Sequence, residues 1–286
     1  MQLLSEVVAA YVTQQAANGR SIHTQRQIAR HGRLLVSALN DPPVARVKHE
    51  AVAAFFASDV VKRTADGSPR RASSANALRS SVRGLFAFAH AAGYAPSNAA
   101  RLVRRSRVPP ARPRALPEPD VARLLNALQR ATAPAGRRDR VMVLVMLKAG
   151  LRVGSVVALD VEDLVGDQLV LRRLKGGGDD SVYLPRDVVA VLVEHIGERR
   201  TGPMFEGERG RRMTTRQVAR RLAEHAERAG IEGANPHALR HRFGCDVFER
   251  TGDVLLTARA MCHRSVASTA VYARPAEAQL RAAVGA

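Results

Sequence analysis

The chain has 286 residues, and 45 lysines and arginines against 26 aspartates and glutamates give it a formal net charge of +19. Such an excess attracts polyanions, so we expect a DNA or RNA partner, although a genome rich in arginine codons would also raise the charge. Two cysteines are too few for a disulfide framework. The apolar run at residues 141–147 is too short to cross a bilayer and no export signal is visible, so we expect a cytoplasmic protein without a membrane partner.

The first hundred residues carry apolar side chains at helical spacing. This spacing predicts helices over residues 3–12, 28–39, 47–56 and 78–88, with Ser73 or Ser74 as the cap of the last helix and Gly93 at its end. A compact helical module is therefore expected over residues 1–105. Its cations are either solvated surface charges or contacts to phosphates. The candidate DNA-binding residues are Arg26, Arg30, Arg33, Lys62, Arg63, Arg70, Arg71, Arg104, Arg105 and Arg107.

The composition changes at residues 106–116, where arginines alternate with prolines and no acid occurs. Proline removes a backbone donor and disfavours helix in the residue before it, so this segment is predicted to be an extended, positively charged linker. A second domain is expected over residues 117–286.

This second domain is predicted to be mostly helical with a small sheet. Helices at residues 118–131 and 137–149 precede three short apolar segments, 156–164, 168–174 and 181–184, which are separated by glycine-containing turns. Helical patterns resume at residues 187–197, 215–229 behind a threonine cap, 236–249, 253–260 and 265–271. The predicted fold class is mainly α: a helical first domain plus a mixed α/β second domain with a three-stranded antiparallel sheet.

Residues 237–272 concentrate groups that can grip and attack a phosphodiester. His237, His241 and Cys245 recur every fourth position and share one helix face, with Arg240 beside them. Two imidazoles and a thiolate also suit zinc, with Cys262 or His263 as a fourth ligand. Zinc sites usually pair closely spaced ligands from loops, a form that this segment lacks, so we expect no metal.

A wider set of motifs supports phosphodiester chemistry. Gly150-Leu-Arg152, Lys175 at a glycine-rich hairpin, His237-Ala-Leu-Arg240-His241, His263 and Tyr272 follow one another in an order that resembles the tyrosine recombinase, or phage integrase, family. The resemblance covers essentially the whole chain. It implies a core-binding domain at residues 1–105, the basic linker at 106–116 and a catalytic domain at 117–286.

The resemblance implies a role for each matched residue. Arg152 and Arg240 would bind the non-bridging phosphate oxygens, because a guanidinium fork donates two hydrogen bonds and keeps its charge. Tyr272 would be the nucleophile. A phenol is mostly protonated at neutral pH, so it needs a positive charge or a base nearby, which the two arginines and His237 offer.

The remaining catalytic candidates handle protons and hydrogen bonds. Lys175 would donate a proton to the leaving 5′-oxygen as general acid. By the same resemblance, His263 would hydrogen-bond a non-bridging oxygen, and His241 would assist or brace the site as an accessory residue.

Several positions depart from the family pattern. Ser155 stands where the family usually has an acid, and Asp179 and Asp180 occupy a hairpin that commonly carries basic residues. Arg242 replaces a small hydroxyl residue, and Cys262 replaces a glycine. None of these changes removes a predicted catalytic group.

The sequence thus predicts a site-specific DNA recombinase that cuts and rejoins strands through a 3′-phosphotyrosyl intermediate without a cofactor. The partner would be double-stranded DNA, bound by a homotetramer assembled on two DNA sites. The tail at residues 273–286 would dock either on a neighbouring subunit or on its own. The alternatives are a non-catalytic DNA-binding protein of the same fold and a type IB topoisomerase.

Overall fold

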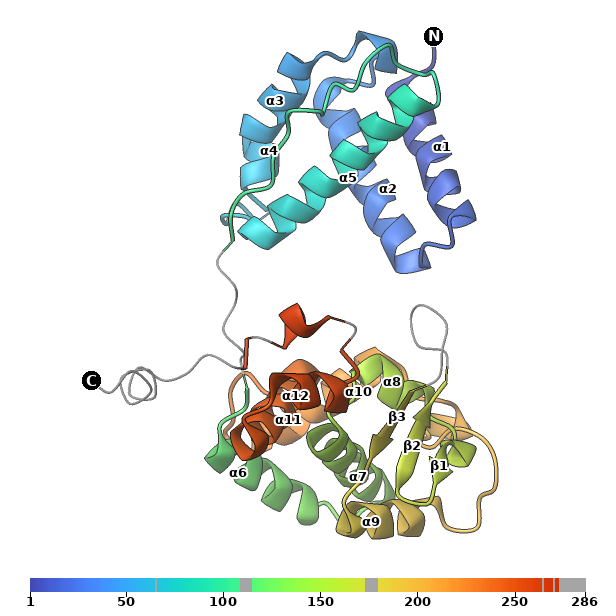
Figure 1. Cartoon of the computed structure of the whole chain (residues 1–286), viewed down its shortest axis with the longest axis vertical. Coiled ribbons are helices and arrows are strands. Elements are labelled where there is room, and N and C mark those ends of the chain that lie inside the picture. Colours follow the sequence, from blue (N-terminus) through green and yellow to red (C-terminus); the bar gives the residue numbers. More distant parts are fainter. Residues whose placement is uncertain (65, 109–114, 173–179, 264, 270, 273–286) are drawn as a thin grey trace, which may run out of the picture. The chain divides into compact units, whose positions relative to one another are not determined.

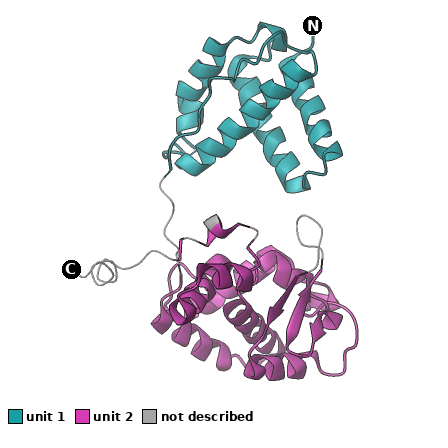
Figure 2. Ribbon diagram, in the orientation of Figure 1, with its two compact units in different colours: residues 1–109 teal, residues 110–286 magenta. Residues whose placement is uncertain are grey.

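The computed structural model describes residues 1–64, 66–108, 115–172, 180–263, 265–269 and 271–272. The chain divides into two compact units, Met1–Pro109 and Pro110–Ala286 (Figure 2).

The Met1–Pro109 unit is helical throughout (Figure 1). Its helices are α1 (Leu4–Ala17), α2 (Ile22–Leu39), α3 (His49–Ala57), α4 (Asp59–Lys62) and α5 (Ala72–Ala91), with a 3-10 turn, η1, at Val44–Arg46. Helices α1, α2 and α5 pack against one another around a core that includes Leu4, Leu35 and Phe86. Gly32 permits the close approach of α1 and α2, since a Cβ there would lie 2.4 Å from a methyl carbon of Val8.

For the last helix in this unit, the predicted start is wrong and the predicted end is confirmed. The prediction of a serine cap is wrong, because α5 starts at Ala72 and Ser73 and Ser74 lie inside its first turn. The prediction for Gly93 is confirmed: it adopts a φ of 77° just after the helix and donates its N–H to the carbonyl of His90.

The Pro110–Ala286 unit is built around α7, which packs against α6, α9 and α11. Its helices are α6 (Glu118–Gln129), α7 (Pro134–Ala149), α8 (Val153–Ala158), α9 (Arg186–Ile196), α10 (Thr215–Arg228), α11 (Pro236–Thr251) and α12 (Val254–Ala260). Three 3-10 turns, η2 (Val161–Asp163), η3 (Glu208–Gly210) and η4 (Val266–Ser268), join them. The apolar run of α7 is buried, including Val145 and Met146, as expected for a central helix.

A small sheet lies beside these helices (Figure 1). Strands β1 (Leu164–Val165), β2 (Gln168–Leu171) and β3 (Asp180–Tyr183) pair antiparallel in the order β1-β2-β3. Leu169, Leu171 and Val182 point into the helical core. The predicted mainly α fold class with a three-stranded antiparallel sheet is confirmed.

Two predicted elements in this unit are wrong. Residues 156–164 were expected to form a strand, but residues up to Ala158 belong to α8 and strand pairing starts only at Leu164. Val156 and Leu159 are buried in the helical core, so tertiary packing overrides the strand preference of a valine-rich run. The helix expected at residues 265–271 is only the 3-10 turn η4.

A bilayer-spanning helix would need a long, nearly uncharged apolar stretch, and none of the helices that the structure describes has one.

Candidate active site

Helix α11 carries three of the predicted site residues on its first two turns. The side chain of Asn235 caps the helix by accepting a hydrogen bond from the backbone N–H of Ala238 at 3.0 Å, and Pro236 occupies the first helical position. His237 is exposed, whereas Arg240 is only 6% exposed. The helix therefore presents an imidazole at the surface and an arginine below it.

Two backbone carbonyls anchor the guanidinium of Arg240. Its Nη1 donates to the carbonyl oxygen of Gly150 at the end of α7, and its Nη2 donates to that of Met261 at 2.7 Å. Burial, together with the nearby charge of Arg152, lowers the pKa of Arg240 to about 10, so the group still carries its charge at neutral pH. A guanidinium has five N–H groups, and the three that these bonds leave over suit a phosphate.

Gly150 makes this anchor possible. It ends α7 with a φ of +60°, and a Cβ at this position would lie 2.1 Å from a ring carbon of Phe243 on α11. Leu151 is buried, and Arg152 follows as the exposed N-cap of α8. Its charge also lowers the pKa of His263, so the two arginines and this histidine lie near one another.

His263 follows α12 and bonds to the segment that leads to Tyr272. Its Nδ1 lies 2.8 Å from the hydroxyl oxygen of Thr269, a residue with no exposed surface. Burial and the charges of Arg240 and Arg152 lower the pKa of His263 to about 4. The imidazole is therefore neutral at physiological pH and able to donate or accept a hydrogen bond.

The side chain of Tyr272 is buried against helix α11. Its side chain belongs to a small apolar cluster with Phe243, Val247 and Met261, and it is 8% exposed. The ring lies against Gly244, where a Cβ would come within 2.7 Å of the Tyr272 Cζ. Burial raises the pKa of Tyr272 to about 12, although the charge of Arg240 opposes this rise.

The Tyr272 hydroxyl contacts His241. The phenol oxygen and the His241 Nδ1 lie 2.6 Å apart, and the two rings are tilted with centroids 5.8 Å apart. Burial, with His237 and Arg240 nearby, lowers the pKa of His241. The accessory histidine, not His237, is therefore the imidazole at the phenol.

The cysteines take no part in a metal centre of the described residues. Burial raises the pKa of both thiols, that of Cys262 to about 12 with a further contribution from the carboxylate of Asp180. Within the described ranges, no three His, Cys, Asp or Glu side chains are placed to hold a metal ion.

Cys262 and Asp180, two of the residues that depart from the family pattern, lie close together in the structure. Cys262 adopts a φ of 48°, a left-handed conformation that glycine adopts most easily. Asp180 opens β3, and its effect on the thiol places the start of this strand next to the turn before His263. Arg242, a third departure, pairs with Asp246 and Glu249 along α11.

Other predicted residues lie elsewhere or outside the description. Lys175 and the tail at residues 273–286 lie outside the described residues, as do positions 109–114 of the predicted linker. In the Met1–Pro109 unit, the exposed Arg26, Arg30 and Arg33 lie along α2. The other exposed DNA-binding candidates are Lys62, Arg63, Arg71, Arg104, Arg105 and Arg107.

Arg70 differs from the other DNA-binding candidates. Its guanidinium donates to the backbone carbonyls of Val60, Val61 and Arg63, with distances of 3.1, 2.8 and 2.9 Å. These bonds close the loop between α4 and α5, so the side chain has a structural task. Its contact with DNA stays a prediction, as do those of the other nine residues.

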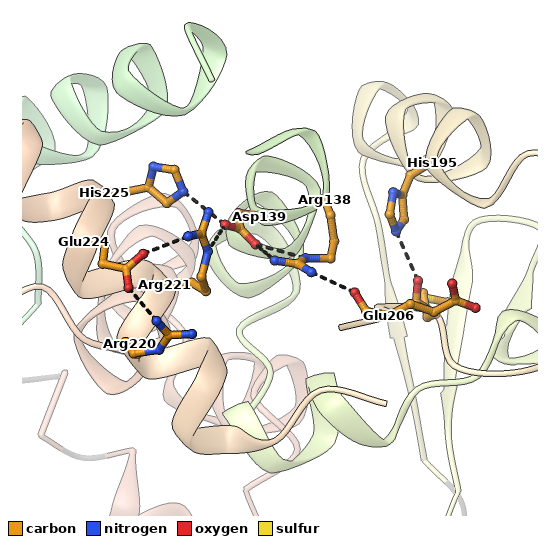
Figure 3. Close-up of polar contacts among 9 residues, drawn as sticks. Arg138, Asp139, His195, Glu206, Arg220, Arg221, Glu224 and His225 are labelled. Carbon is orange, nitrogen blue, oxygen red and sulfur yellow. Dashed lines mark hydrogen bonds and ion pairs between the residues drawn. The ribbon is translucent and has the colours of Figure 1, made fainter. Parts of the chain in front are cut away.

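A second group of arginines surrounds Asp139 on α7 (Figure 3). Asp139 is 1% exposed and accepts hydrogen bonds from Arg138 at 2.6 Å, from Arg221 at 2.7 Å and from His225 at 3.1 Å. Burial by itself would raise the pKa of Asp139, but these hydrogen bonds outweigh it and lower the pKa. The carboxylate thus ties α7 to α10.

Comparisons with known proteins show the family of this chain. The family model described as "Phage integrase family" matches residues 114–279. Tyrosine recombinase XerC of Chromobacterium violaceum is 29% identical over 275 residues, which cover 94% of this chain and 90% of that protein. Tyrosine recombinase XerD of Mycobacterium tuberculosis is 32% identical over 209 residues, which cover 67% of this chain and 66% of that protein.

Solved structures share the fold. A λ integrase dimer bound to a COC′ core site superimposes with a TM-score of 0.75 at 17% identity, covering 96% of this chain and 79% of that one. The XerH recombinase bound to its difH substrate gives a TM-score of 0.71 at 16% identity, covering 91% and 78%. The family model spans more than half of the chain and its matched region contains the arginines, histidines and tyrosine described above, so this protein belongs to the phage integrase family of tyrosine recombinases.

Proposed function

We propose that this protein is a site-specific recombinase that cleaves and rejoins double-stranded DNA through a covalent bond between Tyr272 and the 3′-phosphate. Attack by the phenol oxygen on phosphorus would release a 5′-hydroxyl, and the reverse attack by a 5′-hydroxyl would reseal the strand without a cofactor. The relatives named above are tyrosine recombinases, and the two solved structures of the same fold are bound to a COC′ core site and to a difH substrate.

The observation that carries the proposal is the pairing of Arg240 with backbone carbonyls. Among the described residues, neither Arg240 nor Arg152 forms an ion pair with a carboxylate, although these two like charges are close enough to lower the pKa of Arg240. Uncompensated guanidinium groups near each other, beside the neutral His263 and the phenol of Tyr272, match the charge that develops on a phosphoryl transition state.

We further assign residues 1–105 to core binding and residues 117–286 to catalysis, with Lys175 as the general acid. The basic side chains of both units would contact phosphates of one duplex, which fixes register without reading sequence. A homotetramer on two DNA sites fits this scheme, since λ integrase forms a tetramer bound to a Holliday junction.

A covalent trapping experiment tests the enzyme proposal. The substrate is a duplex recovered from a random-sequence pool by binding to the Tyr272→Phe variant, then nicked next to each candidate scissile phosphate so that the cut fragment diffuses away. The wild-type protein should form a DNA adduct that survives denaturation, and Tyr272→Phe should form none. Binding without an adduct from the wild-type protein would show a non-catalytic DNA-binding protein instead.

Strand exchange separates recombination from topoisomerase activity. Two duplexes that carry the recovered site and different end labels should give recombinant products. Relaxation of a supercoiled plasmid without such products would overturn recombination in favour of a type IB topoisomerase.

A further inference from the structure

Tyr272 lies in a setting that keeps its proton on. The ring is packed among Phe243, Val247 and Met261 and the hydroxyl is sheltered with it, so ionisation would place a negative charge in an apolar cluster. Arg240 favours the charged form but does not cancel the effect of burial on the pKa. An attack by this oxygen therefore requires a group that takes its proton during the reaction.

His241 is placed to do so. Its Nδ1 lies 2.6 Å from the phenol oxygen, within the range of a strong O–H to N contact. Positive charge on His237 and Arg240, which lie on the same helix, helps to lower the pKa of His241. His263 is also nearby, because the charge of His241 lowers the pKa of His263. With its hydrogen on Nε2, the neutral ring offers the Nδ1 lone pair to Tyr272.

We propose that His241 is the proton acceptor for Tyr272 in strand cleavage, a role that rests on the proposed function and for which the sequence had offered His237 as the base. As the Tyr272 oxygen forms its bond to phosphorus, the phenol proton passes to His241 Nδ1 and the bond from phosphorus to the 5′-oxygen breaks. The leaving oxygen takes its proton from another group, the task predicted for Lys175. The reverse proton transfer accompanies resealing.

The position of the phenol depends on the packing around it. Gly244 leaves room for the ring one turn after Arg240, and the backbone N–H of Tyr272 donates to the carbonyl of Thr269 at 2.9 Å. Thr269 is itself bonded to His263. His263 thus contacts the hydroxyl of Thr269 and His241 contacts that of Tyr272, and these two contacts set the phenol against His241.

The test compares His241→Asn with the wild type in the covalent trapping assay. Asparagine can keep an acceptor near the place of Nδ1 but cannot take up a proton at neutral pH. Adduct formation should slow by about 100-fold. The wild-type rate should fall as pH decreases through the titration of His241, and this acid limb should be missing in His241→Asn. The matched control is His195→Asn, a half-buried histidine with a lowered pKa that bonds to the carbonyl of Met204 (Figure 3), and it should react at the wild-type rate.

A substrate with sulfur in place of the 5′-bridging oxygen separates the two proton transfers. A thiolate leaves without being protonated, so this substrate should restore cleavage by Lys175→Ala but not by His241→Asn. Restoration of His241→Asn would place His241 on the leaving-group side and overturn the proposal, as would a wild-type rate and pH profile in this variant on ordinary DNA. If the wild-type protein itself forms no adduct, the proposed function fails as well.

A spectroscopic measurement follows the contact without DNA. The chain has four tyrosines and no tryptophan, so 3-fluorotyrosine labelling gives few fluorine resonances, and Tyr272→Phe identifies that of Tyr272. This resonance should shift as His241 titrates in the wild type and lose the shift in His241→Asn. A Tyr272 resonance that ignores both pH and the substitution would contradict the contact on which the proposal rests.

Discussion

Two groups of arginines in the Pro110–Ala286 unit have opposite surroundings. Arg138 and Arg221 share the carboxylate of Asp139, and Arg221 also pairs with Glu224, so acids neutralise their charge. Arg240 is more deeply buried than either of them, yet its hydrogen-bond partners are the neutral carbonyls of Gly150 and Met261.

The difference shows how an arginine can be fixed for structure or for binding. A carboxylate holds a guanidinium in place and cancels its charge, whereas a carbonyl holds it and leaves the charge for an incoming anion. The Asp139 group therefore joins helices, whereas we expect the Arg240 group to bind a phosphate. Four substitutions test this contrast.

The largest effect is expected at Arg240. Arg240→Lys keeps a positive charge but loses the fork that contacts two carbonyls and a phosphate at once, so adduct formation should fall by about 1,000-fold. The rate of covalent trapping at saturating protein measures this loss. Arg138→Lys changes an arginine whose charge Asp139 neutralises. Below the melting temperature of this variant, its cleavage rate should stay within a few-fold of the wild-type rate. Equal losses in both variants would contradict the contrast.

The next effect concerns stability and comes from Asp139. Asp139→Asn leaves Arg138 and Arg221 without their buried counter-charge and should lower the free energy of unfolding by about 3 kcal/mol, as measured in urea. Because the folded-state pKa of Asp139 is lowered, its contribution is present above the ordinary carboxyl pKa of about 4 and is lost as pH falls through the folded value. The difference between wild type and variant should therefore shrink in acid. A difference that grows in acid would contradict the assignment.

A smaller effect is expected at Gly150. Gly150→Ala forces a side chain into a left-handed position and against the ring of Phe243, which should cost about 2 kcal/mol. The clash should also move the carbonyl away from Arg240 and slow cleavage. A second substitution, Phe243→Leu, should recover part of the stability if the ring is the obstacle. Gly166→Ala is a control for the backbone alone, since its φ is +62° and its Cβ would meet nothing within 4 Å.

The smallest effect is expected at Cys262. Cys262→Gly relieves a non-glycine residue at a φ of 48° and should raise stability by about 1 kcal/mol, seen as a melting temperature a few degrees higher. Cleavage should change little, since Arg240 keeps its bonds to the carbonyls of Gly150 and Met261. A loss of stability would show that the contact between the thiol and Asp180 outweighs the backbone strain.

Local patterns predicted most of the fold. Thr214 caps α10 with a capping box to Gln217, as a threonine before an amphipathic run predicts. The same reasoning failed at residues 156–158, which are helical because Val156 packs into the core beside α7. It also failed at Ser73 and Ser74, which are common caps but lie inside a helix that starts earlier.

The site divides in the same way. The motif order predicted that Arg152, Arg240, His263 and Tyr272 belong to one site, and the described structure places these groups near one another. Sequence reasoning did not single out Gly244 or Thr269. Gly244 could have been found from its position inside a predicted helix. A glycine there destabilises the helix, so it indicates that another group packs closely against the backbone. Nothing in the sequence around Thr269 marks it, because its burial and its bond to His263 arise from folding.

The sequence by itself determined the chemical groups, the helical character and the family, since these depend on residue types and on spacing within short segments. Only the tertiary structure decided that Arg240 is held by a carbonyl 90 positions away and that His241 contacts the phenol of Tyr272, 31 positions away. Both contacts join segments that the chain brings together through the packing of α7 on α11 and of Val271 and Tyr272 on α11. A spacing rule cannot specify such contacts, because a helix face shows which side chains lie together but not what packs against them.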